Sequence, residues 1–369
     1  MKKEGRSFKR IVQSLPRTAI IFFIFGVLAF FMHVLCLFSS ETADFLMATL
    51  GSTVRTVLGA VGGVIPFSIA ELLVVGLPIW VLLLLLLVRL YLRRGGSWVR
   101  ATALFLSFLP LLYALFVFSL GFGYLTTPLD EKIGLSTEEK ISADELYKTG
   151  VWLKEKASEE IPHIAFSETG ESQMMLSKRE MNTALAEAFG TLEKKYSFLS
   201  ARVAPAKAIV LSKPMAYTGI VGVYSFFTGE SNVCTYFPDY STVYTAAHEL
   251  SHASGIARED EANFIAFLAL LESDEPYLRY AAYVNLLQYT LNALYQADKT
   301  LHRELQALLP NEILGEYRAY SRAFDSVGEH PLRDIAESVN DAYLSGVGTE
   351  GTVSYGLVVR YAVAYVKTK

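Results

Sequence analysis

Residues 245–264 read TAAHELSHASGIAREDEANF, and this stretch sets the organisation of the folded part of the chain. It contains the pattern H-E-x-x-H at His248, Glu249 and His252. Residues four positions apart lie on one face of a helix, so both imidazoles can point at a single ion. Gly255 can end that helix with a positive φ, and the acidic stretch 258–264 can start a second one. The spacing predicts a helix, a turn and a helix that returns to the two histidines.

A third protein ligand is needed if one coordination position is to stay open for water. Glu259 and Glu261 are the two candidates. Glu259 is favoured because Asn263 lies four residues later on the same face, where its amide could orient an imidazole N–H. Glu261 remains the alternative. Imidazole and carboxylate ligands together favour zinc (Zn2+).

Glu249 lies one position away from the ligand face, so it would flank the ion and act as a general base towards water. A further hydrogen-bond donor would help to stabilise an oxyanion. The candidates for that donor are Tyr280, His330 and Tyr355, although each is more commonly an ordinary core or surface residue. A solvated helix face is the competing interpretation of the histidine pair, but it does not explain the acidic residues that follow Gly255.

Before residue 124, three apolar stretches are long enough to cross a bilayer, which takes about 20 residues in a helix. They cover about residues 18–38, 69–92 and 101–123. Basic residues precede the first stretch and separate the second from the third: Lys2, Lys3, Arg6, Lys9, Arg10, Arg17, Arg93, Arg94 and Arg100. The positive-inside rule therefore predicts a cytoplasmic N-terminus and an extracytoplasmic C-terminal part. The stretch 43–66 is apolar but interrupted by glycines, and we expect it to lie on the outer membrane surface.

Residues 124–369 have an ordinary charge density and are numerous enough for a real core. Aromatic and β-branched residues around a Gly-Glu turn predict a hairpin at 222–235, whose strand 223–227 could pair with an extended peptide. Helices are expected from residue 243 onwards. The net charge of −4 gives no sign of a nucleic-acid partner, and the two cysteines form no disulfide framework. The predicted fold is α+β, with a transmembrane anchor over 1–123 and a mostly helical extracytoplasmic domain with a small sheet over 124–369.

The stretch HELSHASGIAREDEANF (248–264) resembles gluzincin-type metallopeptidases, in which a helix with E-x-x-x-D/N follows the H-E-x-x-H helix. The three spans, FTGESN at 227–232, the motif itself and VNDAYL with VSYG near the C-terminus resemble a bacterial membrane family, the domain-of-unknown-function 3810 family. This resemblance covers nearly the whole chain. It implies a zincin-like fold and a zinc site, and it brings no substrate. Only six residues separate His252 from Glu259, fewer than in better-known gluzincins, so the third ligand stays open between Glu259 and Glu261.

These observations predict a multi-pass cell-membrane protein that is a zinc-dependent metallopeptidase and hydrolyses amide bonds of extracytoplasmic proteins or peptides. Its expected partners are such a substrate and the lipid bilayer. Two other classes stay open: a non-catalytic metal-binding sensor or scaffold, and a zinc amidase that acts on cell-envelope substrates. The presence of Glu249 favours hydrolysis over a structural site, because a structural site needs no base and normally fills its fourth position.

Overall fold

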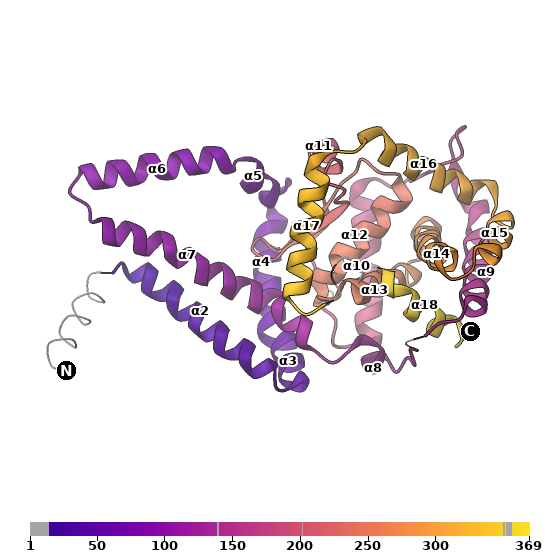
Figure 1. Ribbon diagram of the computed structural model, residues 1–369, viewed down its shortest axis with the longest axis horizontal. Coiled ribbons are helices and arrows are strands. Elements are labelled where there is room, and N and C mark those ends of the chain that lie inside the picture. Colours follow the sequence, from indigo (N-terminus) through magenta and orange to yellow (C-terminus); the bar gives the residue numbers. More distant parts are fainter. Residues whose placement is uncertain (1–14, 139, 201, 350, 352–355) are drawn as a thin grey trace.

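The computed structural model describes residues 15–138, 140–200, 202–349, 351 and 356–369. A mostly helical body carries long apolar helices that project from one end (Figure 1). Those helices are α2 (Arg17–Cys36), α6 (Leu77–Arg93) and α7 (Trp98–Ser119). Helices α2 and α7 pack against each other along their length.

Within the described residues, α2, the segment Ser40–Val64 and α7 are long and apolar enough to cross a membrane. The stretch expected as one span at 69–92 is instead divided into α5 (Ile69–Val75) and α6, which meet at an angle of 70°. Gly76 stands at the break and Pro78 is one of the first residues of α6. Proline lacks the N–H that a continuous helix would need, which explains the break. The pair could still form one bent span.

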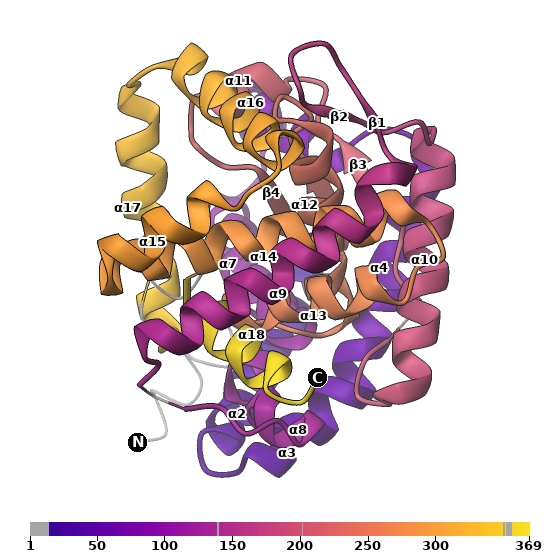
Figure 2. The ribbon, with the colours of Figure 1, turned by 90° about the vertical axis from the view of Figure 1, so that its right-hand side faces the viewer.

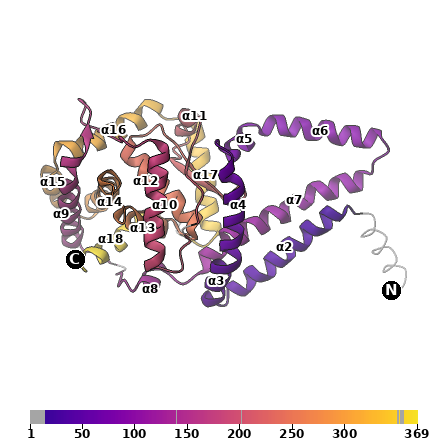
Figure 3. The ribbon, with the colours of Figure 1, turned by 180° about the vertical axis from the view of Figure 1, so that it is seen from behind.

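The segment Ser40–Val64 consists of α3 (Ser40–Leu46), one wider turn, η1 (Met47–Gly51), and α4 (Ser52–Val64). It crosses the end of the body instead of continuing alongside α2 and α7 (Figures 1 and 3). Buried Arg55 on α4 donates hydrogen bonds to the carbonyls of Ala253 at 3.1 Å and Ser119 at 3.0 Å. Since these carbonyls belong to the body and to the end of α7, Arg55 joins the segment to both.

The centre of the body is α12 (Asp239–Ser254), which is buried from Tyr240 to Ser254. It packs against α13 (Glu259–Leu271) and α14 (Pro276–Ala297). Helix α9 (Ala143–Glu160) lies along α14, as Figure 2 shows from the far end of the body. A capping box formed by Ser142 and Glu145 is present at the start of α9.

The remaining helices surround this core. They are η2 (Gly121–Leu125), α8 (Leu129–Ile133), η3 (Ile161–His163), α10 (Lys178–Lys195), α11 (Ser212–Ala216), α15 (Lys299–Ala307), α16 (Asn311–Val327), α17 (Pro331–Gly346) and α18 (Val358–Val366).

Two small sheets accompany the helices. The strands β1 (Ala165–Phe166) and β2 (Ser172–Gln173) form an antiparallel pair. The other sheet has the order β3 (Lys207–Ala208), β5 (Glu230–Val233), β4 (Gly222–Ser225). The predicted hairpin is confirmed as the antiparallel pair β4–β5, while β3 runs parallel to β5. Strand β4 lies at an edge of this sheet and packs on α12, which brings its backbone close to the H-E-x-x-H residues.

Candidate metal site

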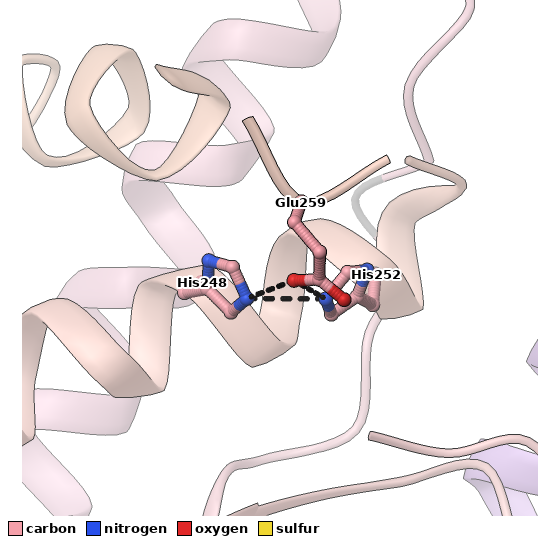
Figure 4. A group of neighbouring side chains, drawn as sticks. All are labelled: His248, His252 and Glu259. Carbon is pink, nitrogen blue, oxygen red and sulfur yellow. Dashed lines mark hydrogen bonds and ion pairs between the residues drawn. The ribbon is translucent and has the colours of Figure 1, made fainter. Parts of the chain in front are cut away.

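The turn between α12 and α13 positions the site. Helix α12 ends at Gly255, whose φ of +118° is a conformation that glycine adopts readily. The chain then reverses, and α13 begins at Glu259. The reversal places the Glu259 carboxylate over the two imidazoles of the preceding helix (Figure 4).

Three ligand atoms converge at this point. The Nε2 atoms of His248 and His252 are 3.1 Å apart. Oε2 of Glu259 lies 3.1 Å from Nε2 of His248 and 3.4 Å from Nε2 of His252. All three side chains are buried, and together they could hold a metal ion.

The Nδ1 atoms of the two histidines contact acceptor oxygens, and these contacts determine which ring nitrogen carries the proton. Nδ1 of His252 lies 2.8 Å from the carbonyl of Ile256, and Nδ1 of His248 lies 3.0 Å from the amide oxygen of Asn263. Both of these oxygens can only accept, so each neutral imidazole carries its proton on Nδ1. Two Nε2 lone pairs and a carboxylate oxygen then face one another. This set of donor atoms suits a bound cation.

The ionised Glu259 carboxylate favours a positive charge in the space between it and the two imidazoles. Although burial disfavours the ionised form, the two imidazoles hold the pKa of Glu259 below its usual range. Burial lowers the pKa of His252, but the Glu259 carboxylate outweighs this effect and raises the pKa to about 9. A buried anion surrounded by two imidazoles thus attracts a cation to the space between them.

Glu249 does not join this group. Its carboxyl is buried, and burial is the main cause that raises its pKa to about 7. It lies beneath strand β4, where a Cβ atom added at Gly222 would collide with its carboxylate oxygen and come within 2.5 Å of Thr245. Glycine at this position therefore leaves room for the carboxyl group.

A cavity of about 550 Å³ opens over the site. Its floor is formed by His248, Glu249, His252 and Glu259. The walls come from strand β4, from α14, from α17 and from the residues directly after α7. The three metal-ligand candidates and the Glu249 carboxyl are consequently accessible from one space.

The structure separates the two candidates for the third ligand. Glu261 turns away from the histidines: its carboxylate accepts a hydrogen bond from the backbone N–H of Leu129 at 2.9 Å and pairs with Arg258 at 2.8 Å. Glu259 is the acid that the fold brings to both imidazoles. Asn263, expected to orient an imidazole, lies beside His248 on the same face of α13 as Glu259.

Two of the three expected oxyanion donors, Tyr280 and His330, are not brought to the cavity. Tyr280 is fully buried elsewhere, and its hydroxyl donates to Glu316. His330 precedes α17, where its Nδ1 accepts from the N–H of Leu332. Neither residue lines the cavity. Tyr355 lies outside the described residues.

Other tyrosines, which the sequence did not single out, line the cavity instead. Tyr224 comes from β4, Tyr289 from α14 and Tyr343 from α17. The Tyr224 ring lies 6.4 Å from that of His252, and in the described part of the chain its buried hydroxyl has no hydrogen-bond partner. Burial raises the pKa of Tyr224 to about 12, so the hydroxyl keeps its proton at neutral pH. The only sequence signal for Tyr224 was its place in the predicted hairpin.

Comparison with known proteins identifies a family but no activity. The profile of a family described as "Protein of unknown function (DUF3810)" matches residues 48–363. The matched range includes the whole candidate site and most of the apolar helices. No curated protein and no solved structure matches the chain.

Proposed function

The chain belongs to the DUF3810 family, and we propose that it is a membrane-anchored zinc-dependent peptidase that hydrolyses amide bonds of proteins or peptides outside the cytoplasm. One observation carries the proposal. The ligand atoms of His248, His252 and Glu259 converge at the floor of an open cavity that the Glu249 carboxyl shares.

The distances within the group support zinc. In a tetrahedral site with zinc–ligand bonds of about 2.0–2.1 Å, two ligand atoms are about 3.3–3.4 Å apart. The three separations here are 3.1, 3.1 and 3.4 Å. Two nitrogens and one oxygen also match the ligand types that zinc accepts, and three protein ligands leave the fourth position free.

The residues around the group have separate roles in this proposal. Zinc, when bound, supplies a Lewis acid that activates water and polarises a substrate carbonyl. Glu249 takes a proton from the attacking water and passes it to the leaving amine. The hydroxyl of Tyr224, which has no hydrogen-bond partner among the described residues, is the proposed donor to the developing oxyanion. Strand β4 lies at a sheet edge beside the cavity, so an extended substrate can pair with its backbone.

The apolar helices support a membrane anchor. In the proposed topology α2, the bent pair α5–α6 and α7 cross the bilayer, while α3 and α4 lie across the end of the body. The basic residues before α2 and between α6 and α7 then face the cytoplasm. Three crossings place the cavity on the opposite side.

The decisive experiment uses the purified full-length chain in detergent. Bound metal is measured by elemental analysis, and cleavage is measured with a mixed peptide library for the wild type, Glu249→Gln and a control, Glu187→Gln, whose carboxyl lies exposed on α10. We expect about one zinc per chain in all three proteins. Cleavage should be lost only in Glu249→Gln, because only this variant lacks the base.

Two results would contradict the proposal. Cleavage that survives in Glu249→Gln would remove this carboxyl from the reaction. A wild-type chain that binds no divalent metal would remove the site itself. Zinc bound in all three proteins with no hydrolysis in any of them would favour the metal-binding scaffold instead.

A further inference from the structure

Helix α17 forms one wall of the cavity. Ala336, Asn340 and Tyr343 line the cavity from this helix. They are spaced by four and three residues, which places them on one face. This face of α17 is therefore part of the candidate site.

A neighbouring face of α17 is apolar and exposed. Leu332, Ile335 and Val339 are 46%, 59% and 64% exposed. Their spacing by three and four residues again defines one face of the helix. The acidic residues Asp334 and Asp341 fall on another side, so no charge interrupts this stripe. A row of large apolar side chains open to water is unfavourable, and such a surface normally marks a contact.

The C-terminal end of α17 is attached to the end of a candidate span. The hydroxyl groups of Tyr343 and Tyr124 are 2.9 Å apart, and Tyr124 comes five residues after the end of α7. The Tyr343 ring also lies 6.1 Å from that of Phe116, which is part of α7. This end of α17 therefore lies where α7 joins the body.

The N-terminal end lies near a second candidate span. His330, which precedes α17, packs its ring 5.0 Å from that of Tyr217. Just before Tyr217 in the chain, the backbone N–H groups of Val210 and Leu211 donate to the Glu71 carboxylate of α5. Helix α17 thus extends from the end of α7 towards the region where α5 meets the body.

Helices α17 and α4 both cross the end of the body from which the apolar helices project (Figures 1 and 3). Val57, Val61 and Val64 of α4 are exposed at this end, at 58%, 63% and 84%. The stripe of α17 is therefore not an isolated apolar patch. It belongs to the end of the body that faces the anchor.

We propose that the exposed apolar face of α17, formed by Leu332, Ile335 and Val339, rests in the interfacial layer of the bilayer that holds the apolar helices. The inference depends on the proposed membrane anchorage and not on the proposed hydrolysis. Because the stripe carries no charge, burial of apolar surface stabilises the contact, and anionic lipid is not required. The wall of the cavity is then in direct contact with lipid.

The test uses the full-length chain in phosphatidylcholine nanodiscs. Val339→Cys and, separately, Ile335→Cys are labelled with an environment-sensitive fluorophore, and lipids with a spin label near the headgroup act as quenchers. The matched control is Ser338→Cys, next to Val339 but on the polar side of α17. Native Cys36 and Cys234 are buried, and the unsubstituted chain, labelled in parallel, gives the background.

We expect lipid-borne quenching at residues 335 and 339 to be at least about twofold stronger than at residue 338. Iodide in the water should show the reverse order. Equal quenching at all three positions, or stronger iodide quenching at 335 and 339, would overturn the proposal. Since no cleavage is measured, the result remains interpretable even if the chain proves to have no peptidase activity.

Discussion

Asn263→Ala is expected to weaken zinc binding without removing a ligand. Asn263 is 2% exposed, and its amide oxygen lies 3.0 Å from Nδ1 of His248. The substitution leaves a buried imidazole N–H without this acceptor, which costs about 1–3 kcal/mol. Loss of such an orienting partner typically lowers metal affinity about 10–100-fold, which corresponds to about 1.4–2.7 kcal/mol. The first value is a cost to the folded chain with or without metal, so the expected loss of zinc affinity is the range of about 10–100-fold.

The assay is competition for zinc against a chromogenic chelator, with the full-length chain in detergent. Asn263→Asp is the conservative variant: it keeps an acceptor oxygen and should bind zinc within a fewfold of the wild type. Asn292→Ala, which removes another amide from the cavity wall, is the matched control and should bind normally. If Asn263→Ala keeps full affinity and a native circular dichroism spectrum, the assigned role of this hydrogen bond is wrong.

Three other substitutions test the remaining parts of the molecule. Gly222→Ala should abolish cleavage while zinc stays bound, because the added methyl group occupies the place of the Glu249 carboxyl. Glu316→Gln should change the pH dependence of stability: burial raises the pKa of Glu316 to about 7 from 4.5, so the folded chain holds a proton that the unfolded chain releases. Its stabilising contribution is present below about pH 4.5, and up to about 3 kcal/mol is lost as the pH rises through about 7. Arg55→Met should destabilise the fold by about 2–5 kcal/mol, since it leaves two buried carbonyls without donors.

Each of these substitutions has its own measurement. For Gly222→Ala, zinc content and cleavage are measured on the same sample, and parallel loss of both would mean that the site has collapsed. For Glu316→Gln, melting temperatures at about pH 5 and pH 8 should differ less than in the wild type; identical pH profiles would exclude the titration. For Arg55→Met, the melting temperature should fall further than for Arg55→Lys, which keeps a donor; equal values would show that the hydrogen bonds contribute little.

The sequence predicted the two histidine ligands on α12, but it left the carboxylate ligand on α13 open between two residues. His248 and His252 follow from helical spacing alone. Glu259 and Glu261 both fall in the first turn of α13, and the side of the helix that each faces depends on where the helix starts. Asn263 favoured Glu259 as the ligand, because a residue four positions later lies on the same face of the helix. Glu261 is held by its neighbour Arg258 and by the backbone N–H of Leu129, and no local pattern reveals the second contact, which spans 132 residues.

The cavity walls could not be predicted from sequence, for the same reason. Tyr280 and His330 were candidates by residue type, but packing directs one towards Glu316 and makes the other the cap of α17. The tyrosines that do line the cavity come from elements that meet only in the folded chain. Tyr224 is brought by the packing of β4 on α12, and Tyr343 by the position of α17.

The apolar helices show where composition and structure diverge. By length and composition alone, Ser40–Val64 is a candidate membrane span. The segment nevertheless contains Arg55, whose guanidinium is buried against the body. A charge at such a position is stable only when its donors are satisfied, and its two acceptor carbonyls lie 198 and 64 residues away in the chain. In 69–92, by contrast, Gly76 and Pro78 were visible in the sequence as the cause of a break.

The contacts of the candidate metal site cross the boundary between the apolar helices and the body. Leu120 and Tyr124, directly after α7, share one buried cluster with Tyr224, Ala253 and Ala257. Ala253 follows His252 directly in the chain, and Ala257 lies in the turn between α12 and α13. The family profile likewise begins at residue 48, within the N-terminal apolar part, and not at the start of the body. A division at residue 124 would therefore cut through the packing that supports the second histidine. It follows that the geometry of the candidate ligands depends on contacts with the residues at the end of α7, so the proposed activity and metal binding should be measured on the full-length chain.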